Sequence, residues 1–119
     1  MKKTLVFGAS LNPGRYSNRV IKRLVDHKVE TEAFGLKTGN ISGVEIHNSL
    51  DHFSEIHTIS LYINPSRQEQ YYQDLIALQP KRIIFNPGTE NPAFYQMLKD
   101  QDIEVEEACT LVLLATRQY

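Results

Sequence analysis

The sequence holds one cysteine, no tryptophan and no long hydrophobic run, and each shortage excludes a class of protein. A single cysteine, Cys109, cannot form an internal disulfide, which favours a reducing compartment. No apolar run reaches the roughly 18 to 20 residues that cross a bilayer. The basic start is followed by only a short apolar run before Gly8, whereas a signal peptide would need roughly 7 to 15 apolar residues there. We therefore expect a cytoplasmic protein with no membrane partner.

The charge gives no reason to expect a nucleic-acid partner. Thirteen Lys and Arg residues face 14 Asp and Glu residues, for a formal net charge of -1. Nucleic-acid binding usually needs a concentrated basic face, and the aromatic residues here do not interleave with Lys and Arg. A chain of 119 residues with 41% hydrophobic residues suits one compact domain over residues 1–119.

Short β-like runs alternate with longer helical patterns along the chain. Strands are predicted over residues 4–7, 29–34, 56–63, 82–85 and 103–105, and helices over residues 17–28, 66–78, 91–98 and 109–115. Residues 35–48 read as a loop. We expect Ser66 to cap the second helix, with Glu69 completing a capping box, and Pro92 to lie in the first turn of the third. The order predicts an α/β fold with about five strands, mostly parallel, and helices on both faces of the sheet.

The loops that follow the strands indicate where a ligand would bind. In an open parallel sheet, ligands sit beyond the carboxyl ends of the strands, where the strand order reverses. The four exits, residues 8–14, 35–38, 64–67 and 86–90, are small, polar and turn-forming, and two of them carry a cation. Turn geometry alone can demand such residues. Four such loops on one rim nevertheless favour a ligand site.

The first exit has the chemistry of a phosphate site. Gly8 permits a sharp turn and a close approach of the backbone to a ligand, and Ser10 and Ser17 offer hydroxyls. Free N–H groups at the start of the next helix favour an anion, and Arg15 supplies a guanidinium suited to phosphate. The alternative is that Ser17 only caps its helix and Arg15 is a solvated surface charge. The loop lacks the middle glycine of the dinucleotide fingerprint.

The second exit separates the candidate ligands. Nicotinamide cofactors usually meet an acidic residue there, which binds the ribose hydroxyls. This chain carries Lys37 instead, which suits a ligand with an added phosphate on the ribose, such as coenzyme A (CoA) or NADP. The alternative is that Lys37 is only a solubilising residue.

Four segments resemble a known family, the small stand-alone CoA-binding domain proteins related to the nucleotide-binding half of the succinyl-CoA synthetase α-subunit. They are residues 6–13, 15–20, 34–37 and 43–50, and Cys109 falls where the family often carries a cysteine. The resemblance implies a three-layer, Rossmann-like fold that binds CoA or an acyl-CoA. It places the diphosphate over the first loop and Lys37 near the adenosine. The implied cofactor-binding residues are Gly8, Ala9, Ser10, Asn12, Arg15, Tyr16, Ser17, Lys37, Asn64, Pro65, Pro87, Gly88 and Thr89.

The resemblance also implies binding without chemistry, because the phosphorylated histidine of the synthetase lies in a domain that this chain lacks. The four histidines match no zinc ligand spacing, so we expect no metal site. Glu90 as a base and Cys109 as a thiol that exchanges with the CoA sulfur are less favoured alternatives, and we expect no catalytic residue.

Two other functions stay open on the sequence alone. The first is an NAD(P)-binding enzyme, which the missing glycine and the missing acid weaken. The second is an interaction or scaffold protein that has lost its ligand, since the chain departs from the family at Gly35, Leu36 and Asn64. A homodimer or a partner enzyme is also open.

Overall fold

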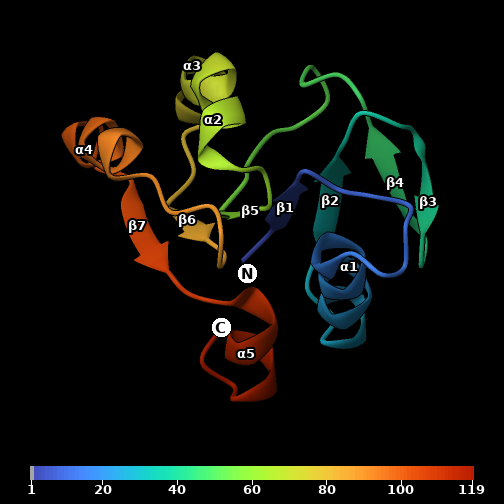
Figure 1. Cartoon of the computed structure of the whole chain (residues 1–119). Coiled ribbons are helices and arrows are strands. Elements are labelled where there is room, and N and C mark those ends of the chain that lie inside the picture. The colour runs from blue at the N-terminus through green and yellow to red at the C-terminus, as the bar shows by residue number, and fades with distance from the viewer. Residues whose placement is uncertain (1) are drawn as a thin grey trace.

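The computed structural model describes residues 2–119 (Figure 1). In this part of the chain, no helix is both long enough and apolar enough to span a bilayer. The elements follow one another as β1 (Thr4–Phe7), α1 (Tyr16–Asp26), β2 (Thr31–Phe34), β3 (Gly39–Ile41), β4 (Val44–His47), β5 (Thr58–Leu61), α2 (Pro65–Gln68), the 3-10 helix η1 (Glu69–Tyr71), α3 (Tyr72–Ala77), β6 (Arg82–Phe85), α4 (Pro92–Asp100), β7 (Glu104–Glu107) and α5 (Thr110–Ala115).

The strands form one sheet in the order β3-β4-β2-β1-β5-β6-β7. β3 and β4 are antiparallel, and every other neighbouring pair is parallel. The predicted fold class, an open and mostly parallel α/β sheet, is therefore confirmed. The expected number of about five strands is wrong, because the sheet has seven.

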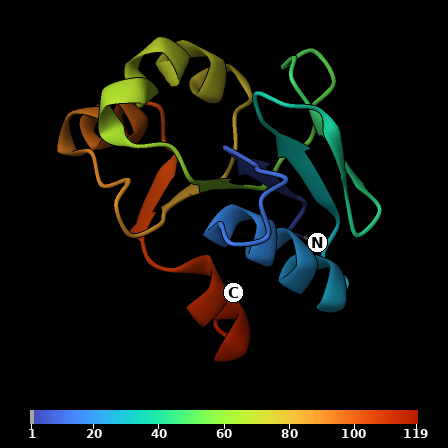
Figure 2. The ribbon, with the colours of Figure 1, turned by 45° about the vertical axis from the view of Figure 1, so that its right-hand side comes forward.

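Helices cover both faces of the sheet. Figures 1 and 2 show α2, α3 and α4 on one side and α1 and α5 on the other. Within β1, Leu5 and Phe7 belong to the core cluster that includes Leu98 of α4, whereas Val6 packs with Leu24 of α1. A strand covered on both faces has no reason to alternate apolar with polar residues, which explains the continuous apolar run of β1.

The two additional strands lie in the segment predicted to be a loop. β3 and β4 form a hairpin whose two-residue turn is Ser42 and Gly43, both with positive φ (52° and 86°). Such a turn matches the twist of a two-stranded ribbon. Val44 and Ile46 point into the core. The hairpin extends the sheet beyond β2 by one parallel and one antiparallel strand.

The predicted helix start is confirmed for α4 and is wrong for α2. Asn91 caps α4 by accepting a hydrogen bond from Phe94 N at 3.3 Å, with Pro92 in the first turn, as expected. The cap of α2 is Asn64, which accepts from Arg67 N at 3.2 Å, so the prediction for Ser66 was wrong. The Ser66 hydroxyl donates to the same Asn64 oxygen. The single helix predicted here is also broken by η1 into α2 and α3.

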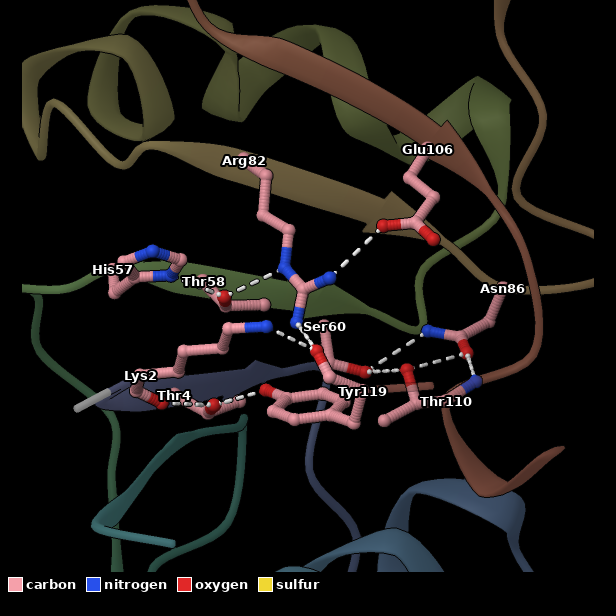
Figure 3. A network of polar contacts seen from close by, with 10 residues as sticks. All are labelled: Lys2, Thr4, His57, Thr58, Ser60, Arg82, Asn86, Glu106, Thr110 and Tyr119. Carbon is pink, nitrogen blue, oxygen red and sulfur yellow. Dashed lines mark hydrogen bonds and ion pairs between the residues drawn. The ribbon is translucent and has the colours of Figure 1, made fainter. Parts of the chain in front are cut away.

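The sheet face opposite α3 and α4 becomes polar at β5 and β6. Figure 3 shows buried Arg82 donating from Nε to Thr58 Oγ1 at 2.9 Å and from Nη1 to Glu106 at 3.0 Å. The ring of Tyr119 lies over its guanidinium, 4.6 Å from Cζ to the ring centroid, and Tyr119 O accepts from Nη2. Further along this face, Asn86 Oδ1 accepts from Thr110 N at 2.9 Å and so holds the start of α5. Tyr119 and the start of α5, both near the C-terminus, thus cover this polar strip.

Candidate functional site

The strand order reverses between β1 and β5. From β1 the chain moves outward through β2 to β4 and β3, and β5, β6 and β7 then follow on the other side of β1. The loops after β1 and β5 therefore diverge in opposite directions and leave a crevice at the carboxyl edge of the sheet. A cleft of about 640 Å³ lies there. This volume is within the range of small-molecule sites.

Most of the predicted cofactor-binding residues line this one cleft. The eleven that do are Gly8, Ala9, Ser10, Arg15, Tyr16, Ser17, Lys37, Asn64, Pro87, Gly88 and Thr89. Asn12 and Pro65 do not line it. Asn12 instead organises the first loop, since its Oδ1 accepts from Gly14 N at 2.9 Å and its backbone oxygen accepts from Arg15 N at 3.0 Å. Pro65 is the first residue of α2.

Gly8 shapes the first loop. Its φ of 100° lies in the region that side chains rarely adopt, and a Cβ there would come within 3.0 Å of Ile63 Cγ2 and 3.1 Å of Tyr62 C. The backbone N–H groups of Gly8 and Ala9 both donate to Phe34 O, at 2.9 and 2.8 Å. The loop after β1 thus packs against the ends of β2 and β5. A ligand can therefore bind only on the side of the loop that faces the cleft.

The start of α1 presents unused hydrogen-bond donors to the cleft. Arg15 is the N-cap residue and makes no side-chain cap bond, so the alternative in which Ser17 caps this helix is wrong. Ser17 lies inside α1, is buried and lines the cleft. Within residues 2–119, the backbone N–H groups of Tyr16 and Ser17 have no acceptor, whereas Asn18 N bonds Arg15 O at 3.1 Å. Free donors and the helix dipole together favour an anion at this position.

The lining carries charge of one sign. Arg15 reaches the cleft from the N-cap of α1, Lys37 from the β2 exit and Arg67 from α2. None of the three makes an ion pair within the described residues. No Asp or Glu of that part of the chain lines the cleft. The chain as a whole has a formal net charge of -1. The positive charge of the cleft lining is therefore a local feature.

The wall of the cleft on the α3 side is aromatic. Phe7 and Phe34 stack with ring centroids 4.7 Å apart, and Tyr71 meets Phe7 edge-on at 5.1 Å. All three line the cleft. Leu11 and Leu36, which are exposed, line it as well. The cleft therefore combines cations and free donors with apolar contact surface, as expected for a ligand that has both phosphate and apolar parts.

Several lining residues were not assigned to the site from sequence. Arg67 belongs to the third exit and Tyr71 to the helix predicted over residues 66–78, and the sequence assigns neither to the site. Arg67 reaches the cleft from α2, and Tyr71 reaches it from the end of η1. The remaining lining residues outside the prediction are Phe7, Leu11, Phe34, Gly35, Leu36, Tyr62 and Ile63. The signal that could have found them is their place at the end of β1 or β2, or in the loops after β1, β2 and β5.

The candidate catalytic groups lie elsewhere or serve structure. Glu90 Oε1 accepts from Gly88 N at 3.0 Å and so holds the loop after β6. Cys109 is half-buried at the start of α5 and does not line the cleft. Tyr62 does line it, but burial raises the pKa of its phenol well above the usual value, so it stays protonated at neutral pH. No His, Cys, Asp or Glu in residues 2–119 lines the cleft.

Comparison with known proteins identifies a family and a shared fold. The family model described as CoA binding domain matches residues 2–115. A crystal structure of an uncharacterized protein is 39% identical, with a TM-score of 0.96, and the match covers 100% of this chain and 98% of that one. A hypothetical protein from Pyrococcus horikoshii OT3 is 25% identical (TM-score 0.86; 98% and 83% covered). A protein from Thermus thermophilus is 23% identical (TM-score 0.87; 99% and 90% covered) and shows the fold alone. No curated protein matches the sequence.

Proposed function

This chain belongs to the CoA binding domain family, and on that premise we propose that it binds CoA or an acyl-CoA in the cleft at the strand-order reversal, without catalysing a reaction. The observation that carries the proposal is the charge of the cleft. Arg15 and Lys37 line it near the ends of β1 and β2, and no carboxylate of the described residues lines any part of it. CoA carries a diphosphate and a ribose phosphate, so its charge complements this lining.

The diphosphate fits the start of α1. The free N–H groups of Tyr16 and Ser17 and the guanidinium of Arg15 converge there, next to the loop that Gly8 allows to turn. Phosphate bound at a helix N-terminus gains both hydrogen bonds and the favourable end of the helix dipole. The Ser10 hydroxyl accepts from Asn12 N at 3.1 Å, which leaves its own proton free to donate to a phosphate oxygen.

The adenosine fits the side of the cleft at the β2 exit. Lys37 lies there, where a nicotinamide-binding protein would have its acidic residue. Gly35 fixes this exit, because its N–H donates to His47 O at 3.0 Å and a Cβ would come within 2.4 Å of Ala9 O. Lys37 therefore follows a closely packed turn, although the chain departs from the family at Gly35 and Leu36. A cation at this position favours a ribose phosphate, as in CoA or NADP.

Binding without chemistry is supported by what surrounds the cleft. General acid–base or nucleophilic catalysis usually relies on His, Asp, Glu, Cys or an activated Ser. Ser10 and Ser17 have no imidazole or carboxylate beside them in the lining. The role that fits this cleft is to hold CoA, or to present it to another protein.

Isothermal titration of the purified protein with CoA, 3′-dephospho-CoA, NAD and NADP tests the proposal. We expect saturable binding of CoA, weaker binding of 3′-dephospho-CoA, and little response to NAD. Tighter binding of NADP than of CoA would favour an enzyme. Silence from all four ligands would favour a scaffold protein.

Substitution of Arg15 tests the phosphate site directly. Arg15→Ala removes a charged hydrogen bond and should weaken CoA binding by roughly 1.5 to 3 kcal/mol. Arg23→Ala is the matched control, because Arg23 is an exposed arginine near the other end of the same helix. Equal affinities for the two variants would show that the diphosphate does not lie at the start of α1.

A further inference from the structure

Arg67 is a cation that the diphosphate and ribose phosphate do not account for. A ligand that has its ribose at the β2 exit and its diphosphate at the start of α1 crosses the strand-order reversal, so its remaining part lies over the exits of β5 and β6. In CoA this part, the pantetheine with its thiol, is uncharged. Arg67 lines the cleft from α2, directly after β5.

The backbone of Arg67 is held firmly. Its N–H donates to Asn64 O at 3.0 Å and to Asn64 Oδ1 at 3.2 Å. The next residue, Gln68, is fully buried, and its Nε2 donates to Ile63 O at 2.9 Å and to Thr89 O at 2.8 Å. One amide thus ties α2 to the exits of both β5 and β6. The position of Arg67 along the rim is fixed before any ligand binds.

The side chain of Arg67, in contrast, has no partner in the described residues. It is exposed, and it forms no hydrogen bond or ion pair there. The lining residues from the exits of β5 and β6, which include Asn64, Pro87, Gly88 and Thr89, are uncharged apart from Arg67. Glu90 holds the loop after β6 through Gly88 N, but it neither lines the cleft nor pairs with Arg67. A fixed backbone that carries an unpaired guanidinium suits a planar anion, since arginine binds a carboxylate through two parallel hydrogen bonds.

We propose that Arg67 makes this cleft selective for acyl-CoA thioesters whose acyl group ends in a carboxylate. The inference rests on the proposed binding of CoA and names the acyl class that the same cleft prefers. The guanidinium pairs with the terminal carboxylate of the acyl group. Neutral acyl groups of the same shape leave it unpaired.

Paired thioesters test this selectivity by isothermal titration. Malonyl-CoA is compared with isovaleryl-CoA, and succinyl-CoA with isocaproyl-CoA, because an isopropyl group then replaces the carboxylate at similar size. We expect at least one carboxylated thioester to bind roughly tenfold or more tightly than its neutral partner, as a charge-assisted hydrogen bond in a cleft allows. Equal affinities within both pairs would overturn the inference.

Variants of Arg67 locate the selectivity. Arg67→Gln should abolish the preference while leaving the affinities for CoA and adenosine 3′,5′-bisphosphate within about twofold of wild type, and Arg67→Lys should retain part of it. Arg23→Gln is the control, being an exposed arginine outside the cleft. If Arg67→Gln weakened CoA and adenosine 3′,5′-bisphosphate as strongly as the carboxylated thioesters, Arg67 would serve the phosphates and the inference would be wrong. Failure of the wild type to bind CoA at all would overturn the proposed function and the inference together.

Discussion

Replacing Gln68 by methionine removes the amide that joins two walls of the cleft. Gln68 Nε2 donates to Ile63 O and to Thr89 O, and its Oε1 accepts from Asn91 Nδ2 at 2.9 Å. Methionine has a similar length and shape but makes none of these bonds. Asn91 keeps a second acceptor, the hydroxyl of Tyr72 at 2.8 Å. The main loss therefore falls on two buried carbonyl oxygens.

The size of this loss follows from the cost of burying unpaired polar groups. Each buried group left without its partner costs about 1 to 3 kcal/mol. For two carbonyls, and with some relaxation of the loops after β5 and β6, we expect Gln68→Met to lower the free energy of unfolding by about 2 to 4 kcal/mol. In a chain of this length that corresponds to a fall in Tm of about 10 °C.

Urea unfolding followed by circular dichroism measures the change, with Gln73→Met as the control. The side chain of Gln73 is exposed on α3 and makes no hydrogen bond within residues 2–119, so its substitution should cost little. Gln68→Met should also weaken CoA binding, because Ile63 and Thr89 both line the cleft. A difference between the two variants below about 0.5 kcal/mol would refute the role of this amide.

Gln68→Glu extends the test to pH. The new carboxylate would face the same two carbonyl oxygens, so its pKa in the folded state should rise above the usual value of about 4.3. The folded state then binds more protons than the unfolded state, and stability falls as pH rises through this range. We expect this variant to gain stability relative to wild type between pH 7 and pH 5. A parallel pH dependence of the two proteins would contradict the assignment.

Three further perturbations test other parts of the fold. Gly8→Ala should lower the free energy of unfolding by roughly 1 kcal/mol or more beyond the loss caused by Gly43→Ala. Both glycines have positive φ, but only Gly8 lacks space for a Cβ. Urea titration of the two variants measures the difference. Lys28→Gly should raise stability by roughly 0.5 to 1 kcal/mol in the same assay, because Lys28 has a φ of 60° where α1 ends. Burial and the neighbouring Arg82 lower the pKa of His57, so the unfolded state binds its proton first and stability should fall as pH drops below about 6.5. His57→Gln should reduce that fall in a pH series of thermal unfolding, and an unchanged slope would contradict it.

The part of the fold that could be predicted from sequence is the part with the strongest local signal. β1 and β6 each contain three consecutive apolar residues, and β5 alternates apolar residues with Thr58 and Ser60. Turn residues follow each strand, and every residue of the three strands is buried. Their exits end in glycine, asparagine and proline, which mark the rim of the sheet. Because ligands of such sheets bind at that rim, eleven of the thirteen predicted site residues came to line one cleft.

The hairpin of β3 and β4 was missed for a physical reason. β3 has three residues, Gly39, Asn40 and Ile41, of which glycine and asparagine are poor strand formers. Its stability comes from pairing with β4 and from the turn at Ser42 and Gly43 rather than from local preference. Single-sequence patterns carry little of that information, although Val44 and Ile46 already alternate with polar residues.

The third exit shows why a side chain can be found in sequence and its role still be missed. The sequence identifies residues 64–67 as one of the two exits that carry a cation, but the local pattern does not show whether Arg67 faces the cleft. In the structure, Asn64 caps a helix of one turn, and that turn brings Arg67 back to the rim. The position depends on Gln68, whose partners lie 5 and 21 residues away along the chain. The position of Arg67 in the cleft therefore depends on how Gln68 anchors α2. A count of the cations in the exit loops does not reveal that position. We expect Arg67→Gln and Gln68→Met both to remove the preference for carboxylated acyl groups, and only Gln68→Met to lower stability. That result would show that Gln68 positions α2 and that Arg67 binds the carboxylate.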